Sequence, residues 1–275
     1  MPFLFSALLL ASCTSRTTLV EATFVDSLIT NYHDPAPLKL VQADLLFWQR
    51  RVDSLPFDLT NQQKWAAALT ERFHLLGNVD DLLRADSIFT GLNRFYKNRE
   101  PGPLLALAGM KMSRHQFQEA KSLVDSAAAL NAMRYAVTLT QFDVAFELGD
   151  VKRADALLRS VLGHNEYGYQ FRRAKLAHYE GETDSAYASM IRAAGLTESP
   201  QLKAIALSNA ADLQLHKGDA GAAADLYRAA IRLNGADFHS IAGLGRIALL
   251  HDHNPQLALR IYSFVAGQHH SPEML

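Results

Sequence analysis

One short pattern recurs along this chain at nearly regular intervals. An apolar, helix-like run leads into a tight turn with glycine or a polar residue, and a small or apolar residue follows a few positions later. The copies are LGNVDDL at 76–82, RHQFQEA at 114–120, LGDVKRA at 148–154, EGETDSA at 180–186, KGDAGAA at 217–223 and HDHNPQLA at 251–258. Their final residues are 38, 34, 32, 37 and 35 positions apart. This spacing predicts a row of similar helical units that stack on one another.

The residues at each turn fit a helical hairpin. Glycine stands where the first helix must end and reverse, a place that favours positive φ, at Gly77, Gly149, Gly181 and Gly218. Asp150 and Asp219 follow at positions that suit the N-cap of the second helix. Alanines occur where the two helices must come close, at Ala120, Ala154, Ala186 and Ala223, and again seven residues on at Ala127, Ala193 and Ala230.

This turn and period resemble the tetratricopeptide repeat (TPR) family over roughly residues 60–272. The resemblance implies an all-α fold, a right-handed α-solenoid of about six helix–turn–helix repeats over 59–272, with 273–275 as a C-terminal tail. The family's first-helix aromatic and Leu-Gly pair are poorly kept, and Leu244-Gly245 is the clearest copy. A helical solenoid of different geometry therefore stays open as an alternative.

The segment before the repeats is helical in pattern but does not repeat. Apolar residues follow one another at helical spacing from Leu38 to Val52, and prolines interrupt the segment at Pro35, Pro37 and Pro56. Because exposed ends of a solenoid need covering, we expect residues 20–58 to form a degenerate N-terminal hairpin or cap.

The chain begins with a short apolar run that ends at its single cysteine. Residues 3–11 read FLFSALLLA, and 10–13 read LASC, which resembles the lipobox of bacterial lipoproteins. That resemblance implies a signal peptide over 1–12, acylation of Cys13, and a short anchor and tether over 13–19. No Lys or Arg precedes Cys13, which departs from the usual basic start of such peptides.

Composition and motifs argue against several functions. Lys and Arg number 27 against 28 Asp and Glu, so the chain lacks the basic excess typical of nucleic-acid binding. His251, His253, His269 and His270 lie close in sequence, but their spacing does not match a metal site. Gly243-Leu-Gly245 resembles a dinucleotide fingerprint, yet it lies in a helical stretch, where the glycines suit close helix packing. We therefore expect no cofactor, no metal and no enzymatic activity.

In TPR proteins, ligands commonly lie on the concave surface formed by the first helix of each repeat. Carried over to this chain, the resemblance implies partner-binding positions at Glu71, His74, Asp143, Phe146, Glu147, Phe171, Lys175, His178, Tyr179, Asp212, His216 and Arg246, with the apolar Leu75, Met112 and Leu215 on the same stripes. Phe171, His178 and Tyr179 lie beside Lys175 and Asp143, a mixture suited to an extended peptide or a helix. The lysines and asparagines with which some members hold a C-terminal carboxylate are absent.

The sequence thus predicts a non-enzymatic scaffold or adaptor lipoprotein that binds a protein or peptide in the bacterial cell envelope. No aspartate follows Cys13, which favours the periplasmic face of the outer membrane. The alternatives are an assembly factor for outer-membrane machinery or a regulator of a cell-wall enzyme. A glycan-binding lipoprotein or an enzyme with an unrecognised site is less favoured.

Overall fold

The structure is a computed structural model that describes residues 17–163 and 166–268. Those residues form fourteen helices and no strand, which confirms the all-α prediction. The helices are α1 (Ala22–Thr30), α2 (Ala36–Ser54), α3 (Leu59–Leu76), α4 (Val79–Phe95), α5 (Pro101–Ser113), α6 (Phe117–Ala129), α7 (Arg134–Glu147), α8 (Val151–Ser160), α9 (Tyr167–Tyr179), α10 (Thr183–Gly195), α11 (Pro200–His216), α12 (Ala220–Leu233), α13 (Phe238–Leu250) and α14 (Pro255–Gln268).

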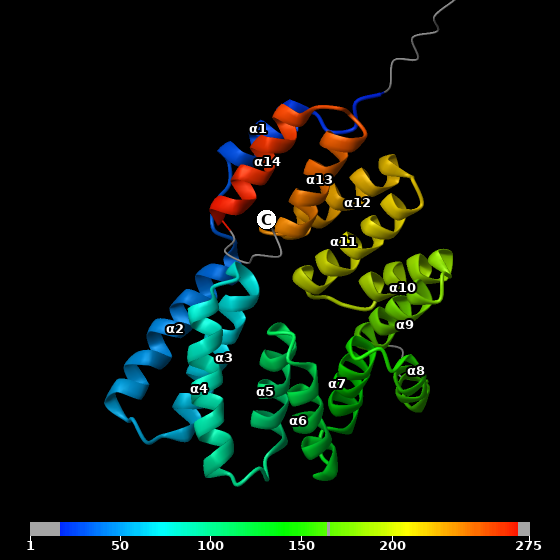
Figure 1. Cartoon of the computed structure of the whole chain (residues 1–275). Coiled ribbons are helices and arrows are strands. Elements are labelled where there is room, and N and C mark those ends of the chain that lie inside the picture. Colours follow the sequence, from blue (N-terminus) through cyan, green and yellow to red (C-terminus); the bar gives the residue numbers. More distant parts are fainter. Residues whose placement is uncertain (1–16, 164–165, 269–275) are drawn as a thin grey trace, which may run out of the picture.

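From α3 onward, the helices pair into consecutive hairpins, α3 with α4 through to α13 with α14. Each hairpin packs on the next, and Figure 1 shows them following one another along a curve. The chain is therefore an α-solenoid, as predicted. Among the first helices of the hairpins, α5 contacts α7, α7 contacts α9, and α11 contacts α13. These contacts place the first helices on the shorter, inner side of the curve.

The turns have the backbone geometry that the sequence predicts. Gly77, Gly149, Gly181 and Gly218 have φ between 68° and 87°. The turn of the second copy lacks glycine, and there His115 takes the left-handed conformation instead, with φ 55°. Asn, Asp and His enter this region more readily than other side chains, so the turn survives without its glycine.

The capping and packing positions are also confirmed. The side chain of Asp150 accepts a hydrogen bond from the Arg153 N–H, and that of Asp219 accepts one from the Ala222 N–H. The predicted small residues are fully buried between helices: Ala120, Ala127, Ala154, Ala186, Ala193, Ala223 and Ala230. Side chains this small allow the paired helices to approach closely.

The two helices before the repeats lie at opposite ends of the solenoid. We expected residues 20–58 to form one hairpin or cap at the N-terminal end. Only α2 lies there, packed on α3, whereas α1 packs against α14 (Figure 1). Residues 31–35 join the two helices, so a short connection links both ends of the solenoid.

Polar contacts hold the N-terminal segment on the last repeat. The carboxylate of Asp252, between α13 and α14, accepts hydrogen bonds from the backbone N–H groups of Leu19 (3.0 Å) and Val20 (2.8 Å). Arg228 of α12 donates to the Leu19 carbonyl, and Arg260 of α14 pairs with Asp26. Val20 and Val25 are buried in the same apolar cluster as residues of α13 and α14. We call residues 19–30 the N-terminal clasp.

Several predictions concern residues outside the described part of the chain. These are the signal peptide over 1–12, the anchor at Cys13, His269 and His270, and the tail over 273–275. Among the residues that are described, none of the helices is both long and apolar enough to cross a membrane.

Candidate functional site

The predicted partner-binding residues lie on the first helices of five hairpins. Glu71 and His74 lie on α3, Asp143, Phe146 and Glu147 on α7, Phe171, Lys175, His178 and Tyr179 on α9, Asp212 and His216 on α11, and Arg246 on α13. These helices form the inner side of the curve, so the set is spread along the concave face. The residues fall into two neighbouring groups, with Glu71 and His74 lying apart from both.

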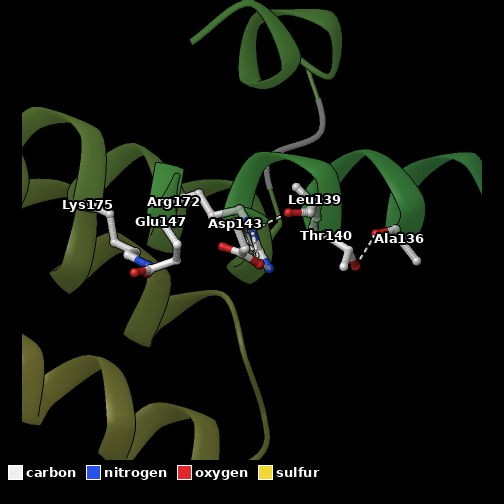
Figure 2. Close-up of polar contacts among 8 residues, drawn as sticks. Ala136, Leu139, Thr140, Asp143, Glu147, Arg172 and Lys175 are labelled. Carbon is white, nitrogen blue, oxygen red and sulfur yellow. Dashed lines mark hydrogen bonds and ion pairs between the residues drawn. The ribbon is translucent and has the colours of Figure 1, made fainter. Parts of the chain in front are cut away.

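The first group joins α7 to α9 through two ion pairs, shown in Figure 2. Arg172 pairs with Asp143 and also donates from its Nε to the Leu139 carbonyl oxygen at 3.1 Å. Burial raises the pKa of the Asp143 carboxyl, and the neighbouring Arg172 opposes part of that rise. Arg172 therefore links α9 to α7, and its charge is compensated by Asp143.

The second ion pair between α7 and α9 is more exposed than the first. Lys175 Nζ lies 3.3 Å from Glu147 Oε1 and 5.0 Å from the centre of the Phe146 ring. Tyr179 meets the same ring edge to face, with centroids 5.8 Å apart, and its side chain is largely in solvent. Lys175 therefore already has an anion and an aromatic face as neighbours.

The second group surrounds a hollow between α9, α11 and α13, lined in part by Met190 of α10, which we call the groove. Its volume is about 310 Å³, and its apolar floor consists of Ala174, Met190 and Leu213. The polar side chains that line it are Lys175, His178, Asn209, Asp212, His216 and Arg246. The rings of His178 and His216 meet edge to face, with centroids 5.4 Å apart. The structure thus brings five of the predicted residues to one hollow: Lys175, His178, Asp212, His216 and Arg246.

Asp212 is held from behind by two residues that the sequence did not single out. Its Oδ1 accepts a hydrogen bond from the Tyr227 hydroxyl at 2.5 Å, and its Oδ2 lies 2.7 Å from His239 Nε2. The hydrogen bond to Asp212 raises the pKa of the His239 imidazole, which favours its protonated form. Both carboxylate oxygens of Asp212 are therefore occupied by neighbours of the same chain.

Arg246 differs from the other cations of this face. It is exposed at the edge of the groove, and among residues 17–163 and 166–268 it forms neither a hydrogen bond nor an ion pair. A guanidinium carries five N–H donors and stays charged at all physiological pH values. The groove therefore contains one cation whose donors are available to a ligand.

Phe171 lies elsewhere than its predicted companions. Its ring is half-buried, stacks on Tyr167 with centroids 5.6 Å apart, and packs against the cluster between α9, α10 and α11. It does not line the groove. Its contribution within this structure is to the packing of neighbouring hairpins.

Gly243 leaves room for the ring of Tyr227, the residue that hydrogen-bonds Asp212. A Cβ atom built on Gly243 would lie 2.4 Å from Cζ of Tyr227, and one on Gly245 would lie 3.1 Å from Cζ of Tyr262. The two glycines lie within α13, with no strand before them in the described chain. Close helix packing is the role that the sequence predicted for this pair.

Comparison with known proteins reveals the fold and no nearer relationship. No family model matches the chain, and no curated protein matches it. Among solved structures, it is similar to a tetratricopeptide repeat protein from Parabacteroides merdae, with a TM-score of 0.61, 12% identity, and 90% and 94% of the two chains covered.

Two further structures show the same fold. A TPR protein from Thermus thermophilus has a TM-score of 0.59 and 18% identity, over 70% of this chain and 100% of that one. A chain of the Cut9–Hcn1 hetero-tetramer of APC/C has a TM-score of 0.63 and 16% identity, over 82% of this chain. This chain spans only 43% of that longer protein. The fold of the present chain is therefore of the TPR type.

Proposed function

We propose that this protein is a non-enzymatic scaffold or adaptor that binds a protein or peptide partner through its concave face. TPR-type folds are generally interaction scaffolds, which supports the class of function. The observation that carries the assignment is the groove, in which side chains from three successive first helices surround one hollow. Its polar rim above an apolar floor is the arrangement that orients a bound segment and gives it specificity.

The groove is large enough to take one or two side chains of a bound polypeptide. Ligand pockets of drug-sized molecules start at about 300 Å³ and extend to several times that volume. The groove stands at the lower end of this range and is open to solvent along the concave face. A peptide can therefore place one or two side chains in it while the rest of the segment follows the first helices.

The test is partner capture by the full chain from envelope extracts. Replacement of the exposed groove residues, as His178→Ala with Arg246→Glu, is expected to lower partner recovery at least about tenfold. Lys203→Glu is the matched control, because Lys203 is exposed on α11 and does not line the groove. Equal recovery with the double variant and the control would reject the groove as the binding site.

Tyr179→Ala probes the neighbouring surface formed by α7 and α9 in the same assay. Tyr179 is exposed, so its truncation tests a contact with the partner rather than the fold. Phe171 is unsuited to this purpose, since its ring packs between hairpins and its loss would disturb them.

We also propose that the protein is a lipoprotein of the bacterial cell envelope, anchored through Cys13 at the periplasmic face of the outer membrane. The proposal rests on the LASC segment and the apolar run before it. Acyl chains contribute about 0.8 kcal/mol per buried methylene, so a multiply acylated cysteine would hold the protein at the membrane. Cys13→Ser should move the protein to the soluble fraction and abolish palmitate labelling. Unchanged fractionation of that variant would exclude the anchor.

A further inference from the structure

Some charged side chains around the groove have partners within the protein, and one has none among the described residues. This difference indicates what the groove binds. On the α7–α9 side, Arg172 and Lys175 have Asp143 and Glu147 as partners. On the α11 side, the carboxylate of Asp212 is held by Tyr227 and His239. Arg246 alone among the charged residues lining the groove lacks a partner within the described chain.

We propose that the groove binds an acidic peptide segment and that Arg246 receives one of its carboxylates. This inference rests on the proposed function and specifies the chemistry of the partner. A guanidinium and a carboxylate match in two parallel hydrogen bonds, which gives both orientation and affinity. Arg246 is an exposed multiple donor with no acceptor from the described chain, so its complement is an acceptor with a negative charge.

The other polar groups of the rim support an anionic ligand. His178 and His216 line the groove with their rings edge to face, and each imidazole can offer a ring N–H to a carboxylate oxygen. Asp212, the acidic residue of the lining, is engaged by two donors, which weakens its repulsion of an incoming anion. The groove therefore presents donors to a ligand at three positions.

The floor of the groove is already packed within the protein. Ala174, Met190 and Leu213 line it but are only 1%, 3% and 5% exposed, so they leave little apolar surface for a ligand to cover. Recognition therefore depends on the polar and charged side chains of the groove, and the acidic residues of the peptide are the part that it distinguishes.

Fluorescence polarisation with two labelled peptides tests the proposal on the full chain. The acidic probe is GEFEEFE, and its basic counterpart is GKFKKFK. We expect the acidic peptide to bind, the basic one to bind at least about tenfold more weakly, and affinity for the acidic peptide to fall as salt is raised. Arg246→Glu should lower that affinity about tenfold or more, whereas Lys203→Glu should change it less than about twofold.

Three outcomes would overturn the proposal: no binding of the acidic peptide at millimolar concentration, tighter binding of the basic peptide, or equal binding to wild type and Arg246→Glu. Circular dichroism of both variants verifies that the helices are retained. Partner capture separates this inference from the proposed function. Capture that depends on the groove while GEFEEFE fails to bind leaves the scaffold function standing and rejects the acidic ligand.

Discussion

At its C-terminal end the solenoid is covered by the N-terminal clasp, whereas at its N-terminal end α2 leaves apolar side chains in solvent. Leu40 and Phe47 of α2 are 67% and 51% exposed, and Phe57 in the turn after it is 93% exposed. At the other end, Val20 and Val25 are buried and the Asp252 side chain is 1% exposed. Both ends have apolar side chains on their outer face, and within residues 17–163 and 166–268 only the C-terminal end is covered.

The difference between the two ends shows which contacts hold α1 on the C-terminal end of the solenoid. Apolar burial alone does not distinguish the two ends, because α2 also has apolar side chains that α1 could have covered. Asp252 distinguishes them, since its buried carboxylate accepts hydrogen bonds from the Leu19 and Val20 N–H groups as well as contacting the neighbouring His251. Directional hydrogen bonds thus select the end, and apolar contacts of Val20 and Val25 stabilise the choice.

Removal of the Asp252 carboxylate should have the largest effect. Asp252→Ala leaves the N–H groups of Leu19 and Val20 without an acceptor, and the free energy of unfolding should fall by about 2–4 kcal/mol. Urea denaturation followed by circular dichroism measures this change. Asp184→Ala, at an exposed partner of Lys217, should leave the midpoint nearly unchanged. Similar midpoints for both variants would contradict the role of Asp252.

A pair of apolar truncations compares the two ends directly. Val25→Ala removes buried methyl groups of the clasp itself and should cost about 2 kcal/mol. Leu40→Ala on exposed α2 should change stability by less than about 0.5 kcal/mol. Thermal and urea unfolding of the two variants measures the difference. An equal cost would mean that the exposed face of α2 is covered in solution.

Substitution of two helical glycines should change stability by smaller amounts and in opposite directions. Gly243→Ala at the clasped end forces a Cβ against the Tyr227 ring and should destabilise by about 1–2 kcal/mol. Gly91→Ala in α4, near the open end, meets nothing within 4 Å and should stabilise by about 0.5–1 kcal/mol. Melting temperatures that shift in the same direction would refute this assignment of the two sites.

Low pH should weaken the attachment of the clasp, with a smaller effect than the substitutions above. Burial raises the pKa of Asp252, but hydrogen bonds from His251, Leu19 and Val20 outweigh it, and the net shift is downward. A carboxyl with a depressed folded pKa contributes stability above its unfolded value of about 3.9, and that stability is lost as pH falls through the folded pKa. Exchange of the Val20 amide hydrogen, corrected for intrinsic rate, should therefore quicken below about pH 4. Asp252→Asn should lack this acid dependence.

The fold was predictable because its information is local. The turn residues Gly149 and Gly218 and the caps Asp150 and Asp219 act within a few positions, and the alanines repeat at helical spacing. The clasp was not predictable in this way. Its hydrogen bonds join residues 233 and 232 positions apart, and no periodicity of 20–58 indicates which end of the solenoid α1 covers.

The candidate site was predictable in part. A position on the inner stripe of a first helix identified Lys175, His178, Asp212, His216 and Arg246, which the structure gathers in the groove. Arg172 and His239 were missed because their partners lie in the preceding hairpin. Cross-hairpin pairs on this face have separations of 27, 28 and 29 residues, a little short of one repeat. Opposite charges at that spacing are the signal that would have found them.

The clasp also imposes an order on folding. α1 leaves the ribosome ahead of every repeat, yet the surface that receives it is completed only when α13 and α14 have emerged. Contacts of such long sequence separation form slowly, because the intervening chain must first be arranged. The clasp is therefore made before the repeats and docks after them, and until then Val20 and Val25 are exposed to solvent on the unfolded chain. A chaperone that covers these valines would act before α14 is in place. A truncation that removes α14 would leave them exposed.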